Sequence, residues 1–195
     1  MLLDLDFITP YYRTRDVAAE LQTAGVDVVA PEGDLSRSDL PVVTARAVQA
    51  LVNYDGPVIA DIGGDEGARV IGSLSGNLRP GTYAAYMVVN PYRPGTGTPA
   101  HVAEYARWLE QVARVKFTGL INNANAGLLT QRQHVQEGLK QVEEAGRLLD
   151  LPVLVSAAKT DVAAQLTGLK VLSLQLKMRP VWELAATGEG ESSAE

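Results

Sequence analysis

Short apolar runs alternate with longer stretches of helical periodicity along most of this chain. The runs have the length of β-strands, and several are apolar throughout, as expected for strands whose two faces are both covered. The strands predicted from these runs cover residues 1–5, 26–30, 57–62, 83–89, 116–122, 152–156 and 171–174.

Two of the intervening stretches carry strong helix signals. Thr98 and Pro99 form an N-cap and first-turn pair, and apolar residues then recur every three or four positions. A second stripe of the same period runs from Val135 to Leu148. Further helices are predicted over residues 14–24, 44–53 and 66–77.

The repeated order of strand, helix and strand predicts an α/β fold. Such an order produces a doubly wound, mainly parallel sheet with helices on both faces. We expect one domain over residues 1–184, followed by a disordered acidic tail at 185–195, where the residues are small and polar. Because ligands of such sheets bind beyond the carboxyl ends of the strands, the residues that follow each strand are the candidates for function.

Composition narrows the range of partners and compartments. A net charge of −6 with scattered basic residues argues against a general nucleic-acid binder. The absence of cysteine excludes disulfides, thiolate metal sites and a cysteine nucleophile. The sequence shows no signal-peptide pattern and no apolar run near the ~18 residues of a membrane span. We therefore expect a cytoplasmic protein that binds neither nucleic acid nor a membrane.

Carboxylates gather after the first and third predicted strands. Asp4 and Asp6 alternate on the first strand, and Asp61 comes shortly before Gly63 and Gly64. A carboxylate at a strand end can hold Mg²⁺ through water, and a nearby glycine lets a backbone N–H approach a phosphate closely. The alternatives are that Asp61 caps the helix that follows, and that Asp4 and Asp6 are solvated acids at a sheet edge.

Three asparagines, Asn122, Asn123 and Asn125, end the fifth predicted strand. An asparagine side chain offers both a donor and an acceptor, the complement of an adenine edge. The alternative is local turn chemistry, which asparagine also favours. His101 and His134 each lie near a helix start without a second ligand at metal spacing, so we expect neither to bind a metal.

The chain resembles the MinD/ParA/nitrogenase iron-protein class of P-loop ATPases in four segments that occur in the same order. These segments are DLDFITP, IADIGGDEG, GLINNAN and VSAAKTD. DLDFITP is similar to the DxD segment of that class, and IADIGGDEG to its Walker B strand with the DxxG turn. GLINNAN is similar to the segment whose asparagine reads adenine, and VSAAKTD to the nucleotide-side loop that follows. DLDFITPYYRTRD, DIGGDEGAR and RPVWE resemble, more narrowly, a bacterial branch of MinD-like ATPases.

The resemblance implies roles for individual residues. Asp6 would act in catalysis by placing the attacking water, or would help to hold Mg²⁺, and Asp61 would hold Mg²⁺ through water. Gly63 and Gly64 would lie against the nucleotide, with the N–H of Gly64 sensing the γ-phosphate. Asn123 is the position that matches the adenine-reading asparagine.

The resemblance also implies a switch function. Thr9, Arg13 and Arg15 would lie in the first switch segment, which couples the nucleotide state to a partner protein. The expected protein is a nucleotide-dependent switch that regulates or matures a partner, uses Mg·ATP and forms a homodimer.

The sequence departs from the family at the phosphate-binding loop. It contains no GxxxxGK[ST] and no Gly-Lys dipeptide, although in the family this loop and its strand precede the DxD segment. We therefore expect a P-loop-like fold that lacks its first βα unit, binds ATP poorly or not at all, and has no measurable ATPase activity. The alternative function is a degenerate scaffold or protein-binding module without nucleotide chemistry.

The same departure predicts an open sheet edge beside residues 57–62. In the family the P-loop strand is the neighbour of this strand, and unpaired backbone groups are costly when buried. The chain could be a truncated form of a longer protein, the sheet could close over the gap, or another chain could fill it. We expect the last, through association with a second copy.

Overall fold

The computed structural model describes residues 1–6, 14–30, 43–79 and 81–177. The chain divides into two compact units, one formed by Met1–Pro80 with Lys177–Glu195 and the other by Gly81–Leu176. Each unit contains a parallel sheet with flanking helices, so the predicted α/β class is confirmed. The tail predicted at 185–195 lies outside the described residues, and the single domain over 1–184 stays a prediction.

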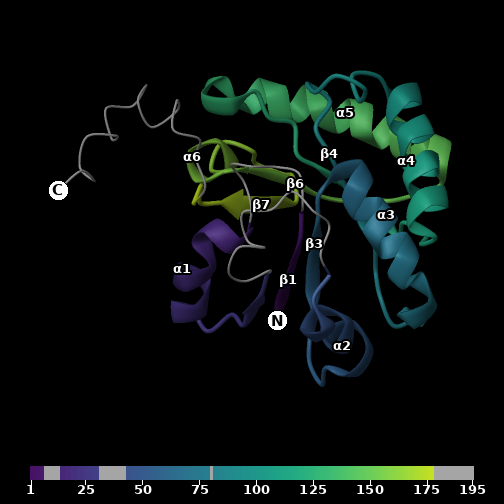
Figure 1. The fold of residues 1–195 in the computed structure, drawn as a ribbon. Helices are drawn as coiled ribbons and strands as arrows, with labels where there is room; N and C mark the ends of the chain where they lie inside the picture. Colours follow the sequence, from purple (N-terminus) through teal and green to yellow (C-terminus); the bar gives the residue numbers. More distant parts are fainter. Residues whose placement is uncertain (7–13, 31–42, 80, 178–195) are drawn as a thin grey trace. The chain divides into compact units, whose positions relative to one another are not determined.

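The first unit is built on a three-stranded parallel sheet. Its strands are β1 (Leu2–Leu5), β2 (Val28–Val29) and β3 (Ile59–Ile62), in the order β2-β1-β3 (Figure 1). The register places Asp4 directly opposite Asp61 on the neighbouring strand. The parallel direction therefore brings the carboxyl ends of β1 and β3 to the same edge.

The helices of the first unit lie near the predicted stretches, although α3 begins at Gly64 rather than 66 and residues 14–17 form a 3-10 turn before α1. In the view of Figure 1, α1 and α3 lie on opposite sides of β1 and β3. Thr44 caps α2 with its hydroxyl, which accepts a hydrogen bond from the N–H of Ala47. The core of this unit includes Leu3 and Leu5, which β1 buries almost completely. The helical segments are η1 (Thr14–Val17), α1 (Ala18–Thr23), α2 (Ala45–Asn53), α3 (Gly64–Leu74) and η3 (Ser75–Asn77).

The second unit is built on a four-stranded sheet whose strands all run parallel. In spatial order its strands are β4 (Tyr86–Val89), β5 (Gly119–Asn122), β6 (Val153–Lys159) and β7 (Val171–Leu174). The helical segments are α4 (Pro99–Ala113), η4 (Gly127–Leu129), α5 (Arg132–Leu149) and α6 (Thr160–Ala163).

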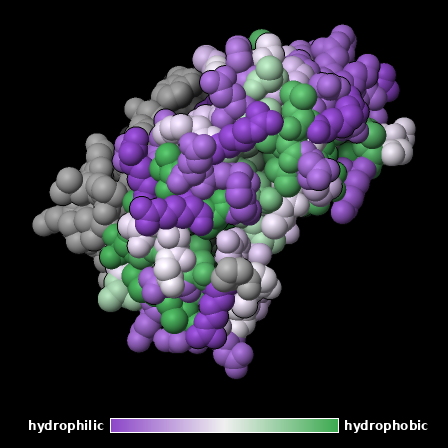
Figure 2. Space-filling model, turned by 90° about the vertical axis from the view of Figure 1, so that its right-hand side faces the viewer, coloured by the Kyte–Doolittle hydropathy of each residue, from purple (hydrophilic) through white to green (hydrophobic). Residues whose placement is uncertain are grey.

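The core of the second unit forms where α4 and α5 pack together over β4 and β5 (Figure 1). Its buried members are Met87, Val89, Val102, Ala106, Leu120, Val142 and Ala145. The alternate positions of β4 are not covered in this way, because Tyr86 and Val88 are 50% and 57% exposed. Hydrophobic residues also reach the surface among polar ones in the space-filling view (Figure 2).

Each sheet has two edge strands, β2 and β3 in the first unit and β4 and β7 in the second. Among the described strands, β3 pairs only with β1, and β4 pairs only with β5. As predicted beside residues 57–62, β3 has no second partner among the described strands, whereas association through it stays a prediction. None of the described helices is long and apolar enough to cross a membrane.

Candidate functional site

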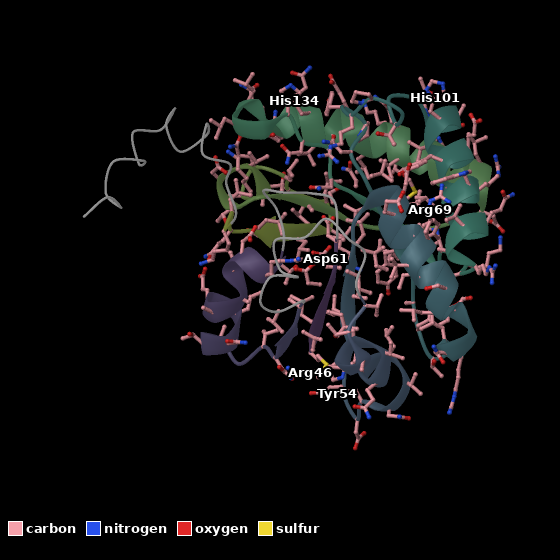
Figure 3. The ribbon with its side chains drawn as sticks, in the orientation of Figure 1. Arg46, Tyr54, Asp61, Arg69, His101 and His134 are labelled. Atoms are coloured by element: carbon pink, nitrogen blue, oxygen red, sulfur yellow. The ribbon has the colours of Figure 1, made fainter. Side chains whose placement is uncertain are left out.

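Five residues of the first unit meet at the carboxyl ends of β1 and β3. They are Asp4, Asp6, Thr14, Arg15 and Asp61, and we call them the acidic corner. Asp4 lies on β1 opposite Asp61, and Asp6 follows the last residue of the same strand. Of Asp6, Asp61 and Asn123, which we expect at one sheet edge, the first two lie together here, whereas Asn123 follows β5 in the sheet of the second unit, so the joint placement stays a prediction (Figure 3 labels Asp61).

An ion pair with good geometry fixes Asp4. The Nε of Arg15 donates to Asp4 Oδ2 at 2.8 Å, and a terminal nitrogen of the same guanidinium reaches Asp4 Oδ1 at 3.3 Å. The backbone N–H of Arg15 also donates to Asp4 Oδ2, and its guanidinium donates to the carbonyl of Asp6. Asp4 and Asp6 are 2% and 7% exposed. The alternative that these acids are solvated at a sheet edge is therefore wrong.

Asp61 bonds to a side chain far away in sequence rather than capping a helix. Its Oδ2 accepts a hydrogen bond of 2.7 Å from the hydroxyl of Thr14, which lies 47 positions earlier. The N-cap of α3 is Gly63, and no side chain caps that helix. The alternative that Asp61 is a helix cap is therefore wrong.

The surroundings of Asp61 make its ionisation costly. Burial raises the pKa of this carboxyl, and the charges of Asp4 and Asp6 raise the pKa further, whereas the hydrogen bond from Thr14 lowers the pKa. Oδ1 of Asp61 has no hydrogen bond to any described residue. A cation beside Asp61 would relieve both the desolvation and the repulsion.

The two glycines that follow β3 are required for different structural reasons. A Cβ on Gly63 would lie 2.1 Å from Oδ1 of Asp6, so only glycine leaves room for this carboxylate. Gly64 has a φ of 49°, in the left-handed region that favours glycine, and it begins α3. Gly63 thus helps to bury Asp6.

The acidic corner contains three carboxylates and one guanidinium. Within the described parts of the chain, no group of three or more His, Asp or Glu side chains is arranged to hold a metal ion. Arg15 engages both oxygens of Asp4, whereas Oδ1 of Asp61 has no hydrogen bond to any described residue. Asp61 is therefore the carboxylate of the corner with an oxygen available for a cation held through water.

The asparagines after β5 separate into two kinds. Asn122 is fully buried, and its amide donates to the carbonyl of Val135 and to the hydroxyl of Ser156 while its Oδ1 accepts from the N–H of Ala124. Asn122 therefore ties β5 to β6 and α5. Asn125 is also used locally, because its Oδ1 accepts hydrogen bonds from the turn that follows.

Asn123 is different from both. Its backbone N–H donates to the carbonyl of Val89, which extends the pairing of β5 with β4. Its half-buried side chain makes no hydrogen bond with any described residue. Hydrogen bonds within the fold thus occupy the side chains of Asn122 and Asn125, while Asn123 keeps its amide available for a ligand.

The residues predicted for the switch segment and the two histidines have different outcomes. Thr9 and Arg13 lie outside the described residues. Arg15 has a side chain only 9% exposed, so its guanidinium faces Asp4 rather than a partner's surface. His101 and His134 lie at the starts of α4 and α5 (Figure 3), and His134 accepts a hydrogen bond from a backbone N–H in a capping box.

The sequence pattern identifies neither Thr14 as the partner of Asp61 nor Asp4 as the partner of Arg15. No short-range signal identifies these contacts, because each depends on how the segment after β1 returns to the sheet.

Comparisons with protein-family models, curated proteins and solved structures found no match for this chain. The MinD/ParA resemblance is therefore a hypothesis that rests on the motifs.

Proposed function

We propose that this protein is a nucleotide-dependent switch of the MinD/ParA-like type, with the acidic corner as its metal and phosphate side. The acidic corner is the observation that carries this proposal. Burying a carboxylate is costly unless a cation or donors meet it, and Asp61 has one oxygen without a hydrogen bond to any described residue while Asp4 and Asp6 lie close by. The position, beyond the carboxyl ends of parallel strands, is where ligands of such sheets bind.

Each residue of the corner has a physical task in this proposal. Asp6 and Asp61 hold a hydrated cation, which supplies positive charge to the phosphates when it is bound. The backbone N–H of Gly64 faces the terminal phosphate. Thr14 and Arg15 tie η1 to the corner, so a change in the corner's charge alters the position of η1. In switch proteins, the charge of a bound ligand commonly changes the conformation of a surface segment in this way.

Asn123 lies in the second unit, and its adenine-reading role is proposed from the family resemblance independently of the acidic corner. Its free amide can pair with the donor and acceptor on an adenine edge. Neighbouring Asn122 and Asn125 are already bonded within the fold.

The proposal includes weak binding. The sequence has no phosphate-cradling loop, so the contacts of Asp and Asn side chains must overcome desolvation and entropy costs alone. We expect an affinity for Mg·ATP on the order of millimolar and no measurable hydrolysis.

A second candidate is a protein-binding module without nucleotide chemistry. The observation that favours it is the ion pair itself, since Arg15 already supplies a positive charge to the acidic corner. On this alternative, nucleotide would leave the corner unchanged.

A nucleotide titration followed by NMR separates the two candidates. Mg·ATP and Mg·GTP are added to the wild type and to the Asp61→Asn and Asn123→Ala variants, with the exposed Asn77→Ala as the matched control. The switch proposal expects saturable shifts with Mg·ATP, weaker binding in Asp61→Asn, and no preference for ATP over GTP in Asn123→Ala. Absence of saturable shifts supports the module, and micromolar binding contradicts the reasoning from the missing loop.

A further inference from the structure

Lys159 is a cation of the second unit that lacks a close partner for its charge. It is the last residue of β6, and its side chain is only 25% exposed. Its ion pair with Asp161 is loose, because Nζ and Oδ2 lie 3.9 Å apart, a separation longer than a hydrogen bond. No described residue accepts a hydrogen bond from this ammonium. A largely buried charge is costly without a close partner, so this position favours an anion.

Asn123 lies at the end of the adjacent strand of the same sheet. β5 and β6 are parallel neighbours, and Asn123 directly follows the last residue of β5. Its side chain also makes no hydrogen bond with any described residue. Two neighbouring strands of the second unit therefore end in polar groups that the fold itself does not use.

The side chain of Asn123 points away from α5. A Cβ on Gly138 of α5 would lie 2.3 Å from the Cβ of Ala124 and 3.2 Å from Oδ1 of Asn122, so both of these residues face that helix. Side chains alternate along an extended segment, so Asn123, which lies between them, faces the opposite side of the sheet.

The side chain of Lys159 points to the same side of the sheet. Ser156 faces α5 together with Asn122, because the amide of Asn122 donates to its hydroxyl. Ala158 packs in a buried cluster with residues of α5 and α6. Lys159 is the next residue of β6 after Ala158, so alternation turns its side chain to the face that Asn123 occupies.

We propose that Lys159 and Asn123 form an oxyanion site at the carboxyl ends of β5 and β6, and that this site takes a phosphate group. Ligands of parallel sheets bind at this end of the strands. The ammonium of Lys159 supplies a positive charge and hydrogen-bond donors. The amide of Asn123 has two N–H groups, so one can donate to the phosphate while the other and the carbonyl oxygen remain for a base.

This site goes beyond the proposed function, because it lies within the second unit and does not require the acidic corner. Nor is Lys159 the lysine that the family resemblance implies. That lysine belongs to the loop that precedes the DxD segment, and this sequence has no such loop.

Asp161 would compete with the phosphate for Lys159. Its side chain is 71% exposed, so its carboxylate can turn to solvent when a phosphate takes its place. Asp161→Asn is therefore expected to lower the Kd for phosphate, because it removes a like charge from the site.

Titration with inorganic phosphate, at constant ionic strength and without divalent cations, tests the site through the amide NMR signals of Asn123, Lys159 and Thr160. Wild type is expected to show saturable shifts with a Kd on the order of millimolar. Lys159→Met should raise this Kd about tenfold or more, because a charge-assisted hydrogen bond is lost, and Lys159→Arg should retain binding. Lys170→Met is the matched control, since Lys170 is exposed and precedes β7 at the opposite end of the sheet.

Adenosine 5′-monophosphate identifies the source of the phosphate. Tighter binding than that of inorganic phosphate indicates a nucleoside phosphate, and equal binding indicates free phosphate. Asn123→Ala should weaken the binding of both.

Three results would overturn the site. They are a wild type without saturable shifts, equal effects of Lys159→Met and Lys170→Met, and an unchanged phosphate Kd in Asn123→Ala. Mg·ATP shifts at the acidic corner together with any of these would contradict this site and leave the proposed function standing.

Discussion

Truncating Arg15 tests the acidic corner most severely, because it leaves a buried carboxylate without its countercharge. The side chain of Asp4 is fully buried, and that of Arg15 is 9% exposed. Removing one partner of such a pair costs about 3–5 kcal/mol. The backbone N–H groups of Asp6 and of residue 15 still donate to Asp4 in the variant, so we expect Arg15→Ala to cost about 3 kcal/mol, the lower end of that range.

An exposed ion pair of the same unit provides the control. Arg46 and Asp27 lie 2.9 Å apart, but their side chains are 55% and 45% exposed. Such pairs contribute about 0–1 kcal/mol, so Arg46→Ala should have little effect. Urea unfolding followed by the NMR signals of β1 measures the stability of this unit directly.

The double variant Asp4→Leu/Arg15→Met removes both charges and refines the test. Replacing a buried pair by apolar residues is often neutral, so the double variant should recover much of the stability that Arg15→Ala loses. Equal effects of Arg15→Ala and Arg46→Ala would refute the reasoning, since the burial of the pair would then have no energetic consequence.

Three further variants follow from the same structure. Gly63→Ala should cost about 1–3 kcal/mol in thermal unfolding, because its Cβ would overlap the carboxylate of Asp6, whereas Gly76→Ala has open space and should not destabilise. Asp61→Asn should stabilise at pH 7, and a gain that persists at pH below 3.8 would contradict this. The pKa of Asp61 is higher in the native state than in the unfolded state, where it is about 3.8. As pH rises from 3.8 through the native pKa, the unfolded state loses its proton more readily, so ionisation of Asp61 increasingly lowers the free energy of unfolding. Asn122→Ala should lower the free energy of unfolding by about 1–3 kcal/mol, because buried groups of β6 and α5 lose their hydrogen-bond partner. A urea midpoint equal to that of the wild type would contradict a stabilising role for these hydrogen bonds.

The alternation of apolar runs and helical stripes is enough to predict the strands and the longer helices of this fold. Boundaries depend on pairing, so β6 extends to Lys159, beyond the predicted end at residue 156, while β4 begins at Tyr86 rather than 83. The short α6 was missed because four residues are too few to show helical periodicity.

The candidate site was predictable to a similar degree. Asp6 and Asp61 follow strands, and parallel strands bring such residues to one edge. The sequence could not show that Arg15 returns to Asp4, because this contact requires the tertiary path of the chain. Nor could it separate Asn123 from Asn122, since only packing decides which side chain is used inside the fold.

Paramagnetic Mn²⁺·ATP provides the most direct test of the acidic corner as the metal and phosphate side of a nucleotide site. Mn²⁺ broadens the NMR signals of nearby amides, so the titration reports where the metal–nucleotide complex binds. We expect selective broadening of the amide signals of Gly63 and Gly64, which is lost in Asp61→Asn and is weaker with Mn²⁺ alone. Broadening that is uniform over the chain, or that is the same in Asp61→Asn, would contradict it.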